Sequence, residues 1–218
     1  MTTTEYAVTA FIILMAVFGI VEAIRTPMIV RRFYRDKSFV DNGKSTLDEV
    51  SDSVVLNNLY TPSLNSAVIN GVTVQQFKAW SLQRRQFTLS KATRKRNQIA
   101  WSVTIVNAQQ SLTPFCARPT VVPEAIIYVN DGKGIEFHGD DEFANRYHVV
   151  TERADIIRPL LTEKIREFLL QPEAISVEVI KSGIIVKRQW QADKVLDRLQ
   201  QEIDIALAIN DWFVSRQQ

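Results

Sequence analysis

The stretch ISVEVIKSGIIVKRQW, residues 175–190, holds two short apolar runs on either side of a turn at residues 181–183. Runs rich in isoleucine and valine that flank a glycine-containing turn are typical of a β-hairpin. Inside the two runs, the charged positions are Glu178, Lys187 and Arg188. The stretch therefore predicts two antiparallel strands of a sheet.

Helical spacing appears on both sides of this hairpin. Residues 153–170 and residues 193–213 repeat apolar side chains at i, i+3 and i+4, which is the stripe of a helix laid against a sheet. Pro159 falls within the first two turns of the earlier helix and predicts a kink or a displaced start. The apolar positions are Ile156, Ile157, Leu160, Leu161, Ile165, Phe168 and Leu169 in the first helix, and Val195, Leu196, Leu199, Ile203, Leu207 and Trp212 in the second.

More strands are predicted upstream of these elements. Asn70 and Gly71 separate the apolar residues 67–69 from the alternating run 72–80, and this arrangement is typical of a hairpin with a tight turn. Residues 99–106 have the β-branched composition of a buried strand. The globular domain is therefore expected to begin near residue 66.

The region between these strands and the first predicted helix is less regular. Prolines within residues 112–123 restrict any strand there to a short strand or an edge strand. Short strands are expected at residues 125–129 and 147–150. Together, five to seven antiparallel strands and two packed helices predict an α+β domain over residues 66–218.

The N-terminal part of the sequence is strongly apolar. Residues 7–24 read AVTAFIILMAVFGIVEAI, in which Glu22 is the only charged residue. As a helix this segment is about 27 Å long, which matches the hydrocarbon core of a bilayer. A buried helix of a globular domain is the alternative, whereas a cleaved signal peptide would need a basic start and a small-residue cleavage motif. The segment predicts an N-terminal transmembrane helix that stays attached.

The charges that flank this segment predict an orientation. Arg25, Arg31, Arg32 and Arg35 follow the apolar run, and no basic residue precedes it. Basic residues favour the cytoplasmic side of a membrane. The expected topology is a single pass, with the N-terminus outside and the C-terminal domain cytoplasmic. The four arginines are expected at the membrane interface, where they either fix the topology or also recognise anionic lipid.

The predicted organisation has three parts. Residues 1–30 form the transmembrane anchor with its flanks, and residues 66–218 form the α+β domain. Between them, residues 31–65 are a juxtamembrane linker with a short amphipathic helix, because Thr46 and Glu49 have capping-box spacing.

Composition excludes several functional classes. Lys and Arg total 26 against 24 Asp and Glu, so the global field that steers nucleic acid is not expected. Cys116 is the only cysteine, which rules out an intramolecular disulfide. The chain contains no Walker-type lysine loop, no G-x-S-x-G elbow and no G-x-G-x-x-G, and we expect no cofactor.

The densest ionisable cluster is an acidic turn at residues 136–142. It combines a histidine with carboxylates, which is the chemistry of acid–base catalysis or of a hard-metal site. The spacing matches no established ligand motif, and Gly-Asp-Asp turns are common on solvated surfaces. A solvated turn and a weak catalytic site both remain open. The candidate residues are His138, Asp140, Asp141 and Glu142, with His148 nearby.

A basic segment at residues 83–97 is the second candidate surface. Its cations are Arg84, Arg85, Arg94, Lys95 and Arg96, together with Lys91. Such a cluster could engage the phosphates of lipid or of nucleic acid. We place a solvated hairpin face first, an anionic membrane surface second and nucleic acid last.

Several phrases occur in a recognisable order after the leading apolar segment. They are VINGVTVQQF at 68–77, FCARPTVVP at 115–123, IEFHGDDEFANRYHVV at 135–150, RADIIRPLLTEKIREFL at 153–169 and SVEVIKSGIIVKRQ at 176–189. This order resembles a broad group of bacterial single-pass membrane-anchored proteins to which no activity is assigned. The resemblance covers residues 65–210, implies the order of the fold and the anchor, and implies no site residue.

These observations favour a non-enzymatic function. We expect a membrane-tethered interaction or scaffolding protein at the cytoplasmic face, which contacts the lipid bilayer and recruits a protein partner or assembles with copies of itself. No nucleic-acid partner is expected. The alternatives are a membrane-associated hydrolase that uses the acidic turn with His138, and a sensor domain that binds anionic lipid through the basic segment.

Overall fold

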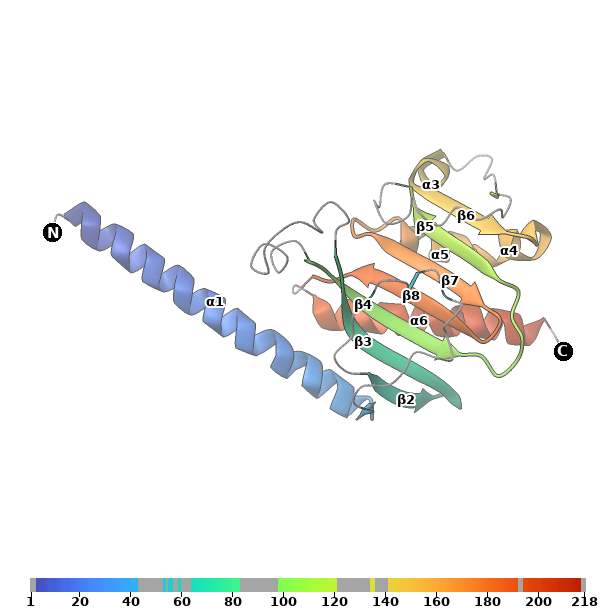
Figure 1. The fold of residues 1–218 in the computed structure, drawn as a ribbon, viewed down its shortest axis with the longest axis horizontal. Coiled ribbons are helices and arrows are strands. Elements are labelled where there is room, and N and C mark those ends of the chain that lie inside the picture. Colours follow the sequence, from blue (N-terminus) through green and yellow to red (C-terminus); the bar gives the residue numbers. More distant parts are fainter. Residues whose placement is uncertain are drawn as a thin grey trace.

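A single antiparallel sheet organises the chain (Figure 1). The structure is a computed structural model and describes residues 3–42, 64–82, 98–120, 141–191 and 194–216, together with residues 53, 55, 56, 59, 134 and 135. Within these residues the sheet has eight strands in the order β1-β2-β3-β4-β8-β7-β5-β6. They are β1 Val40–Asp41, β2 Asn65–Ile69, β3 Val72–Leu82, β4 Gln98–Asn107, β5 Phe115–Pro119, β6 Tyr147–Thr151, β7 Ile175–Ile180 and β8 Gly183–Gln189.

Helices cover one face of this sheet and extend from one end of it. The predicted α+β class is confirmed, although the sheet has more strands than the five to seven expected. The helices are α1 Thr3–Asp36, α3 Asp141–Arg146, α4 Ala154–Leu160, α5 Glu163–Leu169 and α6 Val195–Ser215.

Both predicted hairpins are confirmed. In the first, β2 pairs with β3, and the turn places Asn70 at φ 53° and Gly71 at φ 79°. This left-handed geometry explains why an Asn-Gly pair stands there. In the second, β7 pairs with β8 through Ile180 and Gly183. A Cβ atom on Gly183 would lie 2.9 Å from the carbonyl oxygen of Val106, so this position on β8 accepts no side chain without a shift of β4.

One predicted helix and one predicted turn need correction. The single helix expected at residues 153–170 is two helices, α4 and α5, separated at Leu161 and Thr162. Pro159 lacks the N–H that would continue the helical ladder, and Leu161 has the non-helical angles φ −75° and ψ 63°. The second correction concerns the acidic turn, whose end is helical, since α3 begins at Asp141.

The two faces of the sheet bury different sets of side chains. The face under α6 holds the larger apolar core, which includes Val106, Val177 and Val186 from the strands and also receives α4 and α5. The opposite face buries Phe77, Trp101 and Ile105. Alternation along β4 therefore divides the strand between two cores. The predicted strand at 125–129 and the predicted helix near Thr46 lie outside the described residues.

Helix α1 overturns the predicted topology. It is one continuous helix of 34 residues that extends away from the sheet (Figure 1). None of the helices in the described part of the chain has both the length and the apolar content that a membrane crossing requires. The predicted transmembrane helix is therefore wrong, and so is the single-pass topology with a cytoplasmic C-terminal domain. The apolar segment is only part of α1, because the same helix continues through Arg25 and the later arginines to Asp36.

Candidate functional site

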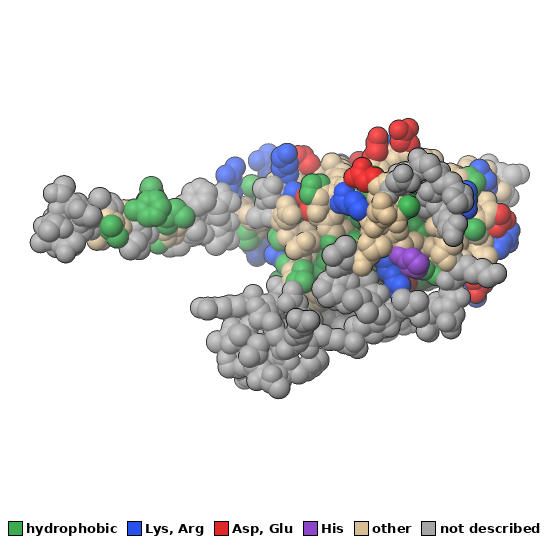
Figure 2. Space-filling model, turned by 90° about the horizontal axis from the view of Figure 1, so that it is seen from above, with side chains coloured by type: hydrophobic (Ala, Val, Ile, Leu, Met, Phe, Trp, Pro, Cys, Tyr) green, Lys and Arg blue, Asp and Glu red, His purple; other side chains and the backbone are tan. Residues whose placement is uncertain are grey.

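The apolar surface of α1 is the largest exposed group of hydrophobic side chains in the described residues. Its members are each between 51% and 65% exposed. Figure 2 shows hydrophobic side chains along this helix, away from the body of the domain. Exposed apolar patches of this kind mark contact sites for proteins or lipids. The residues are Val8, Phe11, Ile13, Leu14, Met15, Val17, Val21, Ile24 and Met28.

The predicted interface arginines lie at the domain end of the same helix. Arg25, Arg31, Arg32 and Arg35 are all exposed. Two of them approach one carboxylate, since Asp36 lies 3.6 Å from Arg32 and 3.8 Å from Arg35. Both arginine side chains remain more than three-quarters exposed in these pairs, so solvent weakens the pairing. The arginines therefore form an exposed basic group that follows the apolar surface along α1.

The last turns of α1 are held by aromatic side chains. Phe33 is 8% exposed and belongs to the main core. Tyr34 packs against Phe33 and Phe39, with ring centroids 5.8 Å and 5.3 Å apart. This end of α1 contacts α6. Burial, with the nearby charge of Glu202 on α6, raises the pKa of the Tyr34 hydroxyl, so the side chain stays neutral.

Glu202 is a carboxylic acid with no exposed surface between α6 and the sheet. Ser102 and Thr104 of β4 donate hydrogen bonds to its two oxygens at 2.5 Å and 3.1 Å. Gln76 of β3 donates to the Thr104 hydroxyl at 3.0 Å and to the Leu199 carbonyl at 3.2 Å. A polar cluster therefore joins α6 to two central strands inside an otherwise apolar layer.

Burial controls the protonation of Glu202. Loss of hydration raises the pKa of its carboxyl group to about 7, although the Ser102 hydrogen bond and the charge of Arg188 act in the opposite direction. A carboxyl group with a pKa in this range changes its charge under physiological conditions.

A second buried cluster lies beside the first and is ionic. Glu173 accepts a hydrogen bond from Arg188 at 3.1 Å and also pairs with Arg198 of α6. Arg188 also donates to Gln171 and Gln201. This cluster ties α6 to β8 and to the segment that follows α5.

The opposite face of the sheet carries its own polar contacts. Glu178 accepts hydrogen bonds from the Ser53 hydroxyl at 2.5 Å and from the Val55 amide at 3.1 Å. Cys116 is the register partner of Glu178. Burial, with the charge of Glu178, raises the pKa of the Cys116 thiol to about 12. Because only a thiolate is a good nucleophile, Cys116 is unsuited to nucleophilic catalysis.

The residues of the acidic turn are not brought together as a site in the described residues. His138 and Asp140 lie outside that part of the chain, and of Asp141 only the backbone is described. Glu142 is paired with Arg146 at 3.3 Å on the surface of α3. His148 is exposed on β6. Among the side chains that the structure describes, no group of three or more His, Cys, Asp or Glu residues could hold a metal ion.

The basic segment is not described by the structure. Its candidate residues are Arg84, Arg85, Arg94, Lys95 and Arg96, which all lie in the gap between residues 82 and 98. Their role stays a prediction.

Sequence reasoning did not find the Glu202 cluster, although two signals for it exist. Glu202 lies three residues after Leu199 and one before Ile203, which puts a carboxylate on the apolar stripe of the last helix. On β4, Ser102 and Thr104 alternate with Trp101 and larger apolar residues. Each of these buried polar positions needs a hydrogen-bond partner, but the sequence does not state which other buried position supplies it.

Comparisons with known proteins give a likeness in fold. No protein-family model matches the chain, and no curated protein matches its sequence. Among solved structures, the chain is similar to the crystal structure of the mycobacterial trehalose monomycolate transport factor A, TtfA. The TM-score is 0.54 and the sequence identity 10%, and the match covers 84% of this chain and 90% of TtfA. At this identity the likeness concerns the fold alone.

Proposed function

We propose that this chain is a non-enzymatic interaction or scaffolding protein that works at a membrane surface, with α1 as its contact element. The observation that carries the proposal is the apolar surface of α1, nine large side chains that are each at least half exposed on a helix that leaves the domain. The proposal concerns association with a membrane surface and involves no membrane-spanning helix.

Charge supports a lipid surface as the target. The four arginines follow the apolar surface along the same helix, and anionic lipid attracts basic residues by about 1 kcal/mol each. An apolar contact reinforced by basic residues is the usual combination for binding at a membrane interface. The likeness in fold agrees with this proposal, since the name of TtfA describes a transport factor.

Vesicle co-sedimentation of the full chain tests the proposal. Leu14→Asp with Val17→Asp places charges on the apolar surface of α1 and should abolish binding to vesicles of phosphatidylcholine and phosphatidylserine. Val68→Asp is the matched control, because Val68 is 72% exposed on β2, outside α1. Arg31→Glu with Arg32→Glu should weaken binding to the anionic vesicles by roughly tenfold or more and leave neutral vesicles unaffected.

Two results would count against a membrane role. Equal vesicle binding by the α1 variants and the wild type would remove α1 as the contact element. The wild type could also fail to bind any vesicle and form an oligomer in sedimentation equilibrium. If Leu14→Asp dissociates that oligomer, the apolar surface of α1 binds a second copy of the chain instead of a membrane.

A further inference from the structure

Two tryptophans and a lysine form a cluster at one end of the sheet. Trp80 of β3 is the register partner of Ala100 on β4, and the backbone amide of Trp190 donates a hydrogen bond to the carbonyl oxygen of Ala100 at 2.8 Å. The two indoles therefore stand on either side of a residue whose side chain is a single methyl group. The ammonium group of Lys78 lies 5.7 Å from the centroid of the Trp80 ring and 4.4 Å from that of the Trp190 ring. Lys78, Trp80 and Trp190 are called the indole cluster below.

The indole cluster can be reached from outside the domain. Its three side chains are each half-buried. Trp101, by contrast, is only 2% exposed on the opposite face of the sheet, where its indole N–H donates to the Ser81 hydroxyl at 2.8 Å. A half-buried indole has an apolar body and a polar N–H, and such side chains are enriched at membrane–water interfaces. A lysine beside them can lay its apolar stem on the rings and keep its ammonium group among the lipid headgroups.

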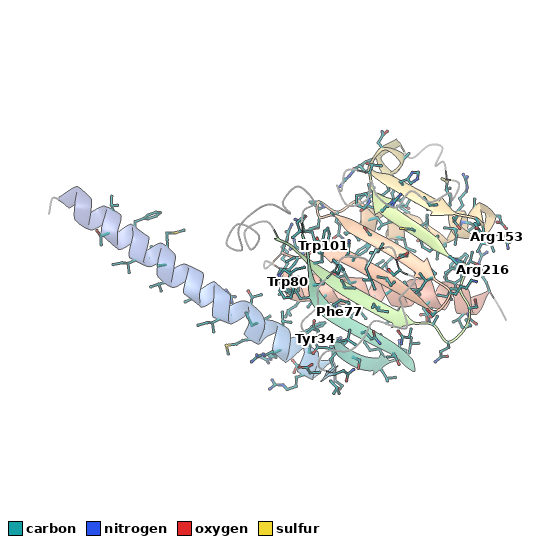
Figure 3. The ribbon with its side chains drawn as sticks, viewed as in Figure 1. Tyr34, Phe77, Trp80, Trp101, Arg153 and Arg216 are labelled. Atoms are coloured by element: carbon teal, nitrogen blue, oxygen red, sulfur yellow. The ribbon has the colours of Figure 1, made fainter. Side chains whose placement is uncertain are left out.

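The position of the indole cluster favours a membrane as its partner. Figure 3 shows Trp80 at the end of the sheet on the side toward which α1 extends. Figure 1 shows α1 leaving the domain on that same side. The apolar surface of α1 and the indole cluster can therefore face one continuous surface.

Positive charge in the sequence is concentrated next to this end of the sheet. The 15 residues between β3 and β4, residues 83–97, include six Lys and Arg and no Asp or Glu. Leu82 and Gln98, which flank this segment, are register partners, and each lies two residues from Trp80 or Ala100 along its strand. An anionic surface is therefore the partner whose charge complements this end of the domain.

We propose that the indole cluster is a second membrane-contact site, which places Trp80 and Trp190 in the headgroup layer of an anionic bilayer and the Lys78 ammonium group beside a lipid phosphate. The inference rests on the proposed function, because α1 makes the first contact. Once α1 is bound, a weak interaction of the cluster suffices, since tethering raises its effective concentration at the surface. A single helix leaves the domain free to turn about the helix axis, and the second contact fixes which side of the domain faces the membrane.

Quenching of tryptophan fluorescence by brominated lipid tests the proposal on the full chain. The chain has four tryptophans, Trp80, Trp101, Trp190 and Trp212, and α1 contains none of them. Quenching therefore reports on contact between the domain and the lipid, whatever α1 does. On vesicles of phosphatidylserine and phosphatidylcholine with brominated acyl chains, Trp80→Phe combined with Trp190→Phe should lose most of the wild-type quenching. Trp212→Phe is the matched control, at a half-buried residue near the other end of α6, and should retain the quenching.

Co-sedimentation with vesicles tests the role of the Lys78 charge. Lys78→Gln should weaken binding to vesicles that contain phosphatidylserine by roughly fivefold and leave binding to pure phosphatidylcholine unchanged. Lys181→Gln is the matched control, because Lys181 is exposed in the turn between β7 and β8, at the opposite end of the sheet from Trp190. This variant should bind as the wild type does.

The two measurements separate this inference from the proposed function. A wild type that sediments with vesicles without being quenched overturns the second contact and leaves α1 as the contact element. Quenching that persists unchanged in Trp80→Phe with Trp190→Phe has the same meaning. Equal binding of Lys78→Gln and the wild type to anionic vesicles overturns the placement of Lys78 beside a phosphate. A wild type that sediments with no vesicle overturns both proposals.

Discussion

The guanidinium group of Arg188 donates a hydrogen bond to the carboxylate of Glu173 at 3.1 Å, and the two side chains are only 2% and 5% exposed. Arg198 approaches the other oxygen of the same carboxylate. One acid is therefore shared by two cations between α6 and the sheet. Removal of the acid would leave both cations without their main partner in a region of low dielectric.

Glu173→Gln should consequently be among the most destabilising polar substitutions in the chain. We expect a loss of about 3–5 kcal/mol in the free energy of unfolding, measured by urea denaturation. Glu163→Gln, on the exposed first turn of α5, is the control and should change stability by less than about 0.5 kcal/mol. A loss at Glu173 as small as that at Glu163 would show that the buried pair contributes little.

The raised pKa of Glu202 predicts that stability depends on pH. The folded state binds the proton more tightly than the unfolded state, whose glutamate has the ordinary value of 4.5. The stabilisation is therefore fully present below about pH 4.5 and is lost as the pH rises through about 7. Denaturation curves between these values should show a loss of roughly 3 kcal/mol at most.

Glu202→Gln should flatten this dependence, because glutamine cannot ionise. Asp211→Asn, on the exposed face of α6, is the control and should retain the wild-type profile. If the curves of wild type and Glu202→Gln stay parallel over the whole range, the pH dependence has another source.

Gly183 should tolerate no side chain. An added Cβ atom would meet the Val106 carbonyl oxygen at 2.9 Å, and backbone atoms of β4 cannot rotate away as a flexible side chain can. Gly183→Ala should lower the free energy of unfolding by about 1–3 kcal/mol. Gly71→Ala offers a comparison with a different cause, since its added Cβ has open space but its φ of 79° strains any other residue. Thermal denaturation of both variants measures the two effects.

The aromatic end of α1 gives a prediction about local stability. Phe33→Ala should remove the side chain of α1 that is buried in the main core, at a cost of about 2–4 kcal/mol to the contact of α1 with the domain. Limited proteolysis should then cut between α1 and the sheet faster than in the wild type. Arg32→Ala, at a side chain that is 77% exposed one position away, should leave the cleavage rate unchanged. Equal rates in both variants would mean that Phe33 does not hold the helix.

The parts of the fold that were predicted correctly are those that local chemistry determines. The Asn70-Gly71 turn and the run before Gly183 specify their hairpins without reference to the rest of the chain. The stripe from Val195 to Trp212 specifies α6 in the same way. The strand order could not be predicted, because the pairing of β4 with β8 depends on contacts between distant segments.

In the candidate site, too, local features could be predicted from the sequence and features that depend on distant contacts could not. The apolar and basic residues of α1 are visible in the sequence. The apolar run and the arginines after it have the pattern of a membrane helix with its flank, and the sequence does not show that both belong to one continuous helix that ends in the domain. The Glu202 cluster depends on the meeting of α6 with β4, and no local pattern states that two polar positions will face each other. Both the docking of the end of α1 and the Glu202 cluster therefore depend on tertiary packing, which the local sequence does not specify.

The order of the strands also constrains how a newly made chain can fold. Ile105 on β4 pairs with Ile185 on β8, and the ribosome must add about 80 residues between the two. At cellular translation rates this takes roughly 4–16 seconds, during which the nascent β4 has an open edge and its apolar side chains lack their cover. Until β8 has been synthesised, the unpaired edge of β4 can pair with other chains and aggregate. Chaperones that bind extended apolar segments could act on the nascent chain during this interval.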